Sequence, residues 1–137
     1  MSSHPNQITF GTDGFRGAVA RDFTYESVRK IAQGLADYIA YKNMRVAEKP
    51  TVVVGYDRRF MSDRFAAAAA DVLTANGVVC AVSDGPLPTQ AVSYLTASKF
   101  GLGVMITASH NPYFYNGVKI KQNGRSAPPS ITAELEN

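Results

Sequence analysis

Short apolar segments that look like strands alternate with amphipathic segments that look like helices along most of this chain. In the first helical segment, apolar residues recur with helical spacing from Val28 through Ile31 and Leu35 to Ile39. Alternation of this kind is typical of helices packed on a largely parallel sheet. We expect strands at residues 8–10, 51–55, 78–82 and 103–107, and helices at residues 24–39, 63–76 and 89–99.

The sequence therefore predicts an α/β protein. We expect a three-layer α/β/α sandwich whose mixed sheet is mostly parallel and has about four strands. Residues 1–7 are predicted to be a loose tail, ahead of one domain at residues 8–137. Residues 118–121 alternate apolar and basic side chains, which predicts a further short edge strand or hairpin arm after a turn at Asn116 and Gly117. Thr24 and Ser62 are the predicted helix caps.

Residues 107–112, Thr-Ala-Ser-His-Asn-Pro, directly follow the last of these expected strands. Because a proline cannot continue a central strand, Ser109 is predicted to lie on a loop at the carboxyl end of the sheet, where open α/β sheets bind ligands. His110, Asn111 and the later Lys119 bring imidazole, amide and ammonium groups toward the same region. Such a serine suits covalent chemistry at a phosphoryl or acyl group. Taken alone, the six residues also fit an ordinary polar loop.

A second polar segment, residues 11–17, contains three glycines around Thr12, Asp13 and Arg16. Glycine lets backbone N–H groups approach a ligand closely, and an arginine offers a fork of donors to phosphate oxygens. The segment lacks the Gly-Lys-Ser/Thr ending of a nucleotide-binding P-loop. By itself, such a segment is more often a plain turn.

A third polar segment, Tyr-Asp-Arg-Arg at residues 56–59, follows the second expected strand. Asp57 and Arg59 fit an exposed ion pair of little energetic value.

Three strings in the same chain and in this order are much more specific than any one of them. They resemble the motifs of the α-D-phosphohexomutase family, which includes phosphoglucomutase, phosphomannomutase and phosphoglucosamine mutase. The resemblance runs from about Ile8 to the end of the chain and covers the first domain of that family. The strings are Phe10-Gly11-Thr12-Asp13-Gly14-Phe15-Arg16-Gly17, Gly55-Tyr56-Asp57-Arg58-Arg59, and Thr107-Ala108-Ser109-His110-Asn111-Pro112 with Asn116-Gly117-x-Lys119.

The resemblance implies that Ser109 carries a phosphoryl group and interconverts hexose 1-phosphate and hexose 6-phosphate through a bisphosphate intermediate. It implies that Arg16, Lys119 and His110 are catalytic. It further implies that Thr12, Asn111 and Lys119 bind substrate. Asp57 and Arg59 become, in this interpretation, a structural pair that shapes the wall of the active site.

The resemblance also implies Mg²⁺ in the full-length enzyme, bound in part through the phosphate on Ser109. The Asp-Gly-Asp-x-Asp loop that this family uses for magnesium does not occur in the chain. We therefore expect a fragment of a longer multi-domain enzyme, with the other metal ligands and the sugar-recognition loops in later domains. The isolated domain is expected to be inactive.

Two other functions compete with a mutase. A free-standing module could use residues 11–17 and the basic residues to bind phosphosugars or other anions without catalysis. A serine hydrolase is disfavoured, because no Gly-x-Ser-x-Gly surrounds Ser109 and His110 is adjacent to it in sequence.

Composition and charge limit the partners. The net charge of +3 comes from scattered basic residues with no stripe of interleaved aromatics, so we expect no nucleic acid. No apolar run reaches the length of a membrane span, and the N-terminus lacks the features of a secretory signal, so we expect no membrane and a cytoplasmic protein. Cys80 is predicted to be a buried, inert thiol. The predicted partners are a hexose phosphate, the remaining domains of the parent protein and, through a face left uncovered, a second copy of the domain.

Overall fold

The computed structural model describes residues 14–42, 51–98, 100–109, 111–122 and 124–126. The predicted tail, the predicted strand at residues 8–10, Thr12 and His110 lie outside the described residues. The elements, in chain order, are β1 (Phe15–Ala18), α1 (Tyr25–Lys42), β2 (Thr51–Tyr56), α2 (Ser62–Ala75), β3 (Val79–Val82), α3 (Thr89–Ser98), β4 (Leu102–Ile106), β5 (Tyr115–Gln122) and β6 (Arg125–Ser126).

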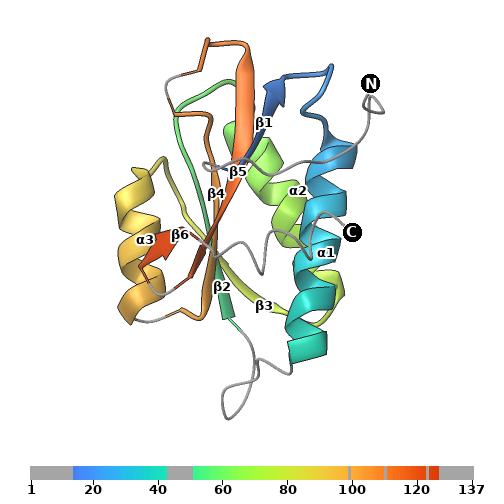
Figure 1. The fold of residues 1–137 in the computed structure, drawn as a ribbon, viewed down its shortest axis with the longest axis vertical. Helices are drawn as coiled ribbons and strands as arrows, with labels where there is room; N and C mark the ends of the chain where they lie inside the picture. The colour runs from blue at the N-terminus through green and yellow to red at the C-terminus, as the bar shows by residue number, and fades with distance from the viewer. Residues whose placement is uncertain (1–13, 43–50, 99, 110, 123, 127–137) are drawn as a thin grey trace.

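One sheet of six strands forms the centre of the molecule, in the order β1-β5-β4-β2-β3, with β6 paired to β5 (Figure 1). The pairs β2–β3 and β2–β4 are parallel, and β5 is antiparallel to β1, β4 and β6. Five of the six described strands therefore run in one direction and β5 runs against them. The mostly parallel mixed sheet is confirmed. The strand count of about four is too low, because β1 lies within the glycine-containing segment that we interpreted as a loop and β6 is only two residues long.

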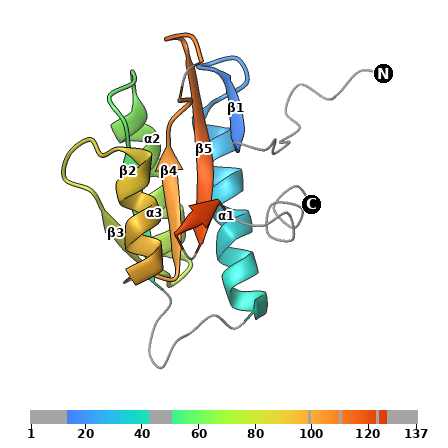
Figure 2. The same ribbon diagram turned by 60° about the vertical axis from the view of Figure 1, so that its left-hand side comes forward.

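The helices cover both faces of the sheet, which confirms the three-layer α/β/α arrangement. Figures 1 and 2 show α3 on one face and the pair α1 and α2 on the other. The larger core cluster lies under α1 and α2 and includes the fully buried Phe23, Leu35 and Phe65. A smaller cluster of Val53, Val92 and Met105 lies under α3.

The two predicted helix caps have different outcomes. Thr24 caps α1 as expected, since Ser27 N donates to Thr24 Oγ1 at 3.1 Å and Thr24 N donates to Ser27 Oγ at 2.8 Å. The prediction for Ser62 is wrong, because Ser62 is the first residue of α2 and the cap position is Met61, whose φ is 65°. The Ser62 hydroxyl instead donates to the Asp57 carboxylate at 2.7 Å and accepts from Asn116 Nδ2 at 2.9 Å.

The predicted turn at Asn116 and Gly117 is also wrong. Both residues lie inside β5, where they pair with Gly17 and Arg16 of β1. The chain turns earlier, where Tyr115 N donates to the carbonyl of Pro112 at 2.9 Å. As a result, β5 is an interior strand of eight residues between β1 and β4, and not a short edge strand. The alternative prediction of a hairpin arm is confirmed, because β5 pairs antiparallel with the preceding strand β4.

Cys80 lies on β3, which is an edge strand of the described sheet. Its side chain is half-buried and not fully buried as predicted, and the burial raises the pKa of the thiol above its usual value. None of the described helices combines the length and the apolar character that crossing a membrane requires.

Candidate active site

Ser109 lies just beyond the carboxyl end of β4. Thr107 and Ala108 are buried, whereas Ser109 is partly exposed, so the chain leaves the core at the serine. The φ of Ser109 is 54°, in the left-handed region, which costs a residue other than glycine about 1–3 kcal/mol. The backbone N–H of Ser109 donates to Thr107 Oγ1 at 3.0 Å. The loop therefore holds the serine in an unfavourable backbone conformation just beyond the carboxyl end of β4.

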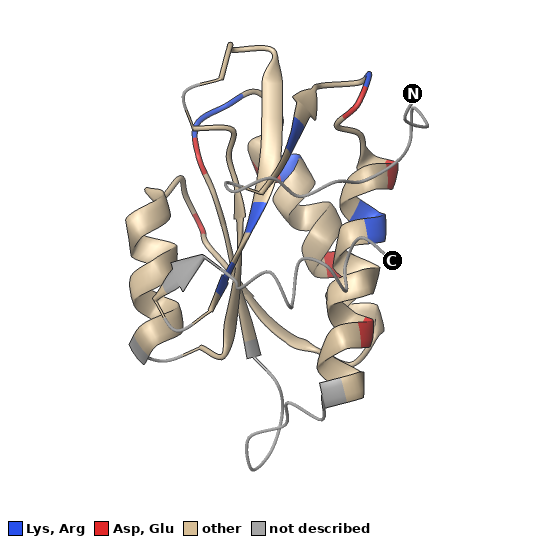
Figure 3. Cartoon of the chain, viewed as in Figure 1, with Lys and Arg blue, Asp and Glu red and all other residues tan. Residues whose placement is uncertain are grey.

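Two cationic side chains meet at the Ser109 hydroxyl. Lys119 Nζ donates to Ser109 Oγ at 2.9 Å, and Arg16 Nη2 approaches the same oxygen at 3.5 Å. Arg16 Nη1 donates to Asn111 Oδ1 at 2.7 Å. The structure thus brings together four residues that the sequence singled out, from β1, β5 and the loop between β4 and β5. Figure 3 shows basic positions on these adjacent strands, β1 and β5.

The pairing of β1 with β5 explains why the two cations converge. Arg16 lies directly opposite Gly117, and Lys119 is two residues further along β5. Because side chains alternate between the faces of a sheet, Arg16 and Lys119 share one face. Lys119 also lies opposite Met105, which packs with Val92 of α3, so the shared face is the one that α3 covers.

Gly117 is a functional position that the sequence reasoning missed, because its Asn-Gly pair looked like a turn. A Cβ at Gly117 would lie 2.8 Å from Arg16 Cγ, 2.6 Å from the carbonyl oxygen of Phe15 and 2.8 Å from that of Thr107. The absence of a side chain lets Arg16 lie across β5 toward Ser109. A glycine inside a predicted strand, as a sign of close backbone approach, is the signal that could have identified it.

Arg59 holds the backbone of the serine loop. Its Nη1 donates to the carbonyls of Pro112 at 2.8 Å and Tyr115 at 3.0 Å, and its Nη2 donates to those of Ser109 at 2.6 Å and Asn111 at 2.7 Å. Arg59 Nε lies 3.6 Å from Asp57 Oδ2, and both side chains are mostly buried. The interpretation as an exposed ion pair is therefore wrong. Asp57 and Arg59 form a structural pair that shapes the loop.

The surroundings of Ser109 favour negative charge. Two cations close to one oxygen stabilise a phosphate or a developing oxyanion, and such stabilisation is often the largest catalytic contribution. Among the described residues, no carboxylate or imidazole is hydrogen-bonded to Ser109 Oγ. Among the described residues, the groups beside Ser109 Oγ are thus cationic, and they include no base of the kind that activates the serine of a hydrolase.

The described residues do not form a magnesium site. Among them, no three histidine, cysteine, aspartate or glutamate side chains come together. The groups next to Ser109 Oγ are cations, whereas Mg²⁺ requires oxygen ligands such as carboxylates and phosphates.

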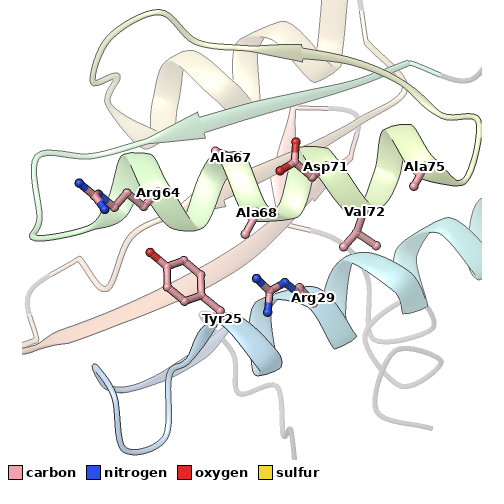
Figure 4. A pocket seen from close by; sticks show the side chains of 8 residues that line it. All are labelled: Tyr25, Arg29, Arg64, Ala67, Ala68, Asp71, Val72 and Ala75. Carbon is pink, nitrogen blue, oxygen red and sulfur yellow. The ribbon is translucent and has the colours of Figure 1, made fainter.

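A separate groove of about 450 Å³ lies between α1 and α2 (Figure 4). Arg29 and Arg64 contribute its cationic side chains and Asp71 its anionic one. It lies on the side of the sheet opposite α3, and no predicted site residue lines it. The groove is therefore distinct from the site around Ser109.

Comparison with known proteins agrees with this geometry. Residues 7–137 match the family described as phosphoglucomutase/phosphomannomutase, α/β/α domain I. The chain belongs to this family, as its domain I. The resemblance that we inferred from three strings is therefore confirmed, while the roles of the individual residues stay predictions.

The relatives of this domain I are much longer proteins. A phosphoglucosamine mutase from Thermotoga neapolitana is 39% identical over 127 residues, which cover 93% of this chain and 28% of that protein. A phosphoglucosamine mutase from Azoarcus sp. (strain BH72) is 38% identical over 140 residues, with 93% of this chain and 29% of that protein covered. The domain thus spans less than a third of these relatives, which fits the expectation of further domains in the parent protein.

Solved structures show the same fold. A protein from Thermus thermophilus that is assigned as a phosphomannomutase superposes with a TM-score of 0.88 at 35% identity, over 97% of this chain and 30% of that one. A phosphoglucomutase from Paramecium in an open form superposes with a TM-score of 0.76 at 20% identity, over 99% of this chain and 26% of that one. At this lower identity the likeness concerns the fold alone.

Proposed function

We propose that this domain I supplies the phosphoryl-carrying serine of a phosphohexomutase, which interconverts hexose 1-phosphate and hexose 6-phosphate. One observation carries the proposal. Lys119 Nζ and Arg16 Nη2 lie 2.9 Å and 3.5 Å from Ser109 Oγ, where a transferring phosphoryl group would leave or arrive. The homologues support it, since the two relatives named above at 39% and 38% identity are phosphoglucosamine mutases.

In the first proposed step, phosphoserine 109 gives its phosphoryl group to the free hydroxyl of a hexose monophosphate. The bond between phosphorus and Ser109 Oγ breaks, a bond between phosphorus and the sugar oxygen forms, and the sugar hydroxyl proton ends on Ser109 Oγ. Arg16 and Lys119 stabilise the negative charge that develops on Ser109 Oγ and on the phosphoryl oxygens.

In the second step, the resulting hexose bisphosphate returns its other phosphoryl group to Ser109. The bisphosphate must turn over within the site, so that the oxygen on C1 and the oxygen on C6 exchange places beside the serine. The product then carries its phosphate on the other carbon, and phosphoserine 109 is restored. The bond between phosphorus and this second sugar oxygen breaks, a bond between phosphorus and Ser109 Oγ forms, and the proton of Ser109 Oγ ends on the sugar oxygen that has lost its phosphoryl group.

Substrate contacts complete the proposal. Asn111 accepts a hydrogen bond from Arg16 through Oδ1, so its amide nitrogen is the group that we expect to donate to a phosphate oxygen. The substrate-binding role of Thr12 and the catalytic role of His110 stay predictions, because both residues lie outside the described ranges. The first sugar to test is glucosamine phosphate, since the relatives named above are phosphoglucosamine mutases.

The remainder of the parent protein has a defined part in this proposal. We expect it to bring the other Mg²⁺ ligands and the sugar-binding loops, because the described residues contain no cluster of metal ligands and the sequence contains no Asp-Gly-Asp-x-Asp loop. An isolated domain I is accordingly expected to be inactive. The cytoplasmic location and the self-association of the domain stay predictions.

An isomerase assay of the full protein that contains this domain tests the proposal. With Mg²⁺ and the 1-phosphates of glucosamine, glucose and mannose in parallel, one of the sugars should be converted to its 6-phosphate. Ser109→Ala should abolish the conversion, and Ser93→Ala, on α3, should leave it unchanged. Activity that survives Ser109→Ala would refute the proposal. A protein that binds these phosphates but converts none of them would instead be a non-catalytic anion-binding module.

A further inference from the structure

A chain of hydrogen bonds runs through the buried side of the serine loop. Asn116 Nδ2 donates to Ser62 Oγ at 2.9 Å, and Ser62 Oγ donates to Asp57 Oδ1 at 2.7 Å. From the other side, Ser109 N donates to Thr107 Oγ1 at 3.0 Å, and Thr107 Oγ1 donates to Asp57 Oδ2 at 2.5 Å. Asn116 and Ser62 are fully buried and Thr107 is 4% exposed. The two branches therefore meet at one carboxylate, whose side chain is 23% exposed.

The direction of each hydrogen bond in this chain is fixed by Asp57. A hydroxyl group has a single proton to donate, and an ionised carboxylate can only accept. Because the Thr107 hydroxyl donates its hydrogen bond to Asp57, its oxygen is left to accept the hydrogen bond from Ser109 N. In the same way, the Ser62 hydroxyl donates to Asp57, and its oxygen accepts the hydrogen bond from Asn116 Nδ2. Hydrogen bonds to a charged acceptor are also the stronger ones, which makes this orientation well defined.

The end of the chain of bonds is the backbone of Ser109, which has the unusual φ of 54°. A strained conformation persists only when the surrounding structure imposes it. Arg59 fixes the carbonyl side of the loop, and Thr107 fixes the N–H of the serine itself. The φ of Ser109 in turn decides where its Oγ lies relative to Lys119 and Arg16.

We propose that Thr107 and Asp57 are positioning residues that hold Ser109 in its left-handed conformation and so place its Oγ between Arg16 and Lys119. Ser62 and Asn116 support this arrangement, because Asn116 Nδ2 donates to Ser62 Oγ and the Ser62 hydroxyl orients the Asp57 carboxylate. The inference rests on the proposed function, since it concerns phosphoryl transfer at Ser109. None of these four side chains donates to the Ser109 hydroxyl, and they act through its backbone.

A positioning role differs from a purely structural one in its kinetic effect. Loss of fold stability lowers the amount of active enzyme, whereas misplacement of the reacting oxygen lowers the rate of each folded molecule. A shift of about 1 Å in a reacting group can cost on the order of a hundredfold in rate. The KM for the sugar phosphate should change little, because the substrate contacts remain in place.

Thr107→Val in the full protein tests the proposal most sharply. Valine keeps the shape of threonine but can neither accept from Ser109 N nor donate to Asp57. We expect kcat per folded molecule to fall by about a hundredfold with KM nearly unchanged. The ³¹P chemical shift of phosphoserine 109 should move, and Thr107→Ser, which keeps the hydroxyl, should restore most of kcat.

Thr96→Val is the matched control. Thr96 is also 4% exposed, and its hydroxyl likewise donates to one acceptor, the carbonyl of Ser93 at 2.7 Å, and accepts from one backbone N–H, that of Gly124 at 2.9 Å. It lies on α3 and takes no part in the chain of bonds around Asp57. Its loss should lower the melting temperature as Thr107→Val does, but leave kcat per folded molecule and the ³¹P shift unchanged.

Ser62→Ala is the second variant, and it keeps the proposal testable if Thr107→Val does not fold. It removes one donor to Asp57 without touching the loop, so kcat should fall in the same direction by a smaller factor. If the wild-type protein carries no phosphoryl group on Ser109, the proposed function fails. If wild type transfers phosphoryl but kcat in Thr107→Val or Ser62→Ala equals that in Thr96→Val, the positioning role fails while the proposed function stands.

Discussion

The chemistry of Ser109 depends on groups that come from other parts of the chain. Its own loop provides Asn111 and a strained backbone, whereas the two cations reach it from β1 and β5. A serine hydroxyl is a weak nucleophile and a poor leaving group in water. Two positive charges within hydrogen-bonding range of its oxygen would stabilise the charge that the proposed phosphoryl transfer creates there.

At this scale the first prediction concerns Lys119→Gln. Glutamine can still donate one hydrogen bond but brings no charge, so phosphoryl transfer should slow by about a hundredfold, as when one donor to a developing oxyanion is removed. The measurement is kcat of the full protein with its sugar phosphate. Lys30→Gln is the control, because Lys30 pairs with Glu26 on the exposed surface of α1 and should leave kcat unchanged. Equal kcat values for Lys119→Gln and Lys30→Gln would show that Lys119 takes no part in phosphoryl transfer.

Gly117→Ala is expected to damage both the fold and the site. Its Cβ would lie 2.6 Å from the carbonyl oxygen of Phe15 and 2.8 Å from Arg16 Cγ, so β1 or Arg16 must move. We expect a loss of about 1–3 kcal/mol in the free energy of unfolding, measured by urea denaturation. Gly85→Ala is the control, since its Cβ would meet no atom within 4 Å. Equal stability of the two variants would contradict this description of the contact between β1 and β5.

Residue identities at the site were more predictable than their geometry. Ser109, Arg16 and Lys119 stood out through their motifs, and the structure brings them together. Neither the two distances nor the role of Gly117 was predictable, because they depend on a β1–β5 pairing between segments far apart in the sequence. The chain of bonds through Ser62 and Asn116 was missed for the same reason, since local patterns assigned those residues to a cap and a turn.

At the scale of the elements, the loop between β4 and β5 is held by the guanidinium of one residue, Arg59. Arg59 arrives from the end of β2, and its guanidinium binds the carbonyls of Ser109, Asn111, Pro112 and Tyr115. A planar group with five N–H donors can reach all four oxygens at once. The position of the serine loop is thus tied to the parallel core of the sheet.

Arg59→Lys tests this support. An ammonium group has three donors at one point, and it cannot replace a fork that reaches carbonyls on both of its terminal nitrogens. We expect a lower melting temperature and at least about a tenfold loss of kcat, because misplacing a reacting group by about 1 Å can cost on the order of a hundredfold in rate. Arg58→Lys is the matched control, because Arg58 is the neighbour of Arg59 in the chain and takes no part in these contacts to the loop. A variant Arg59→Lys that behaves like Arg58→Lys would show that the loop does not need the guanidinium.

The edge strand β3 gives a prediction about pH. Burial raises the pKa of the Cys80 thiol in the folded state, so the unfolded chain releases this proton at lower pH. The contribution of Cys80 to stability is complete below the unfolded pKa of about 8.5 and decreases as the pH rises above it. The urea midpoint should therefore fall further between about pH 7 and about pH 9.5 in wild type than in Cys80→Ser. An equal fall in both proteins would contradict the raised pKa.

The elements themselves were largely predictable. Helices α1, α2 and α3 and strands β2, β3 and β4 lie within a few residues of their predicted ranges, because each has clear periodicity or an apolar run. Strand β1 was missed because it begins directly after Gly14 and contains Gly17, and glycines suggested a loop. Strand β5 was predicted too short because Asn116 and Gly117 have the local chemistry of a turn but the tertiary environment of a central strand.

As a whole molecule, the chain is one α/β/α domain of a family, and it spans less than a third of the length of the relatives named above. Arg16 and Lys119 lie beside Ser109 Oγ, and the described residues contain no cluster of metal ligands. We expect the complete active site to form where this domain meets the rest of the parent protein. The central claim about this domain is that Ser109 alternates between hydroxyl and phosphate.

Peptide mapping by mass spectrometry tests that claim most directly. The full protein is incubated with hexose 1,6-bisphosphate and Mg²⁺, quenched and digested, and the phosphorylated residue is located. We expect one phosphoryl group on Ser109, its transfer to hexose monophosphate when that sugar is added, and no phosphoryl group in Ser109→Ala. A phosphoryl group on another residue, or isomerase activity with Ser109 unmodified throughout, would contradict the account.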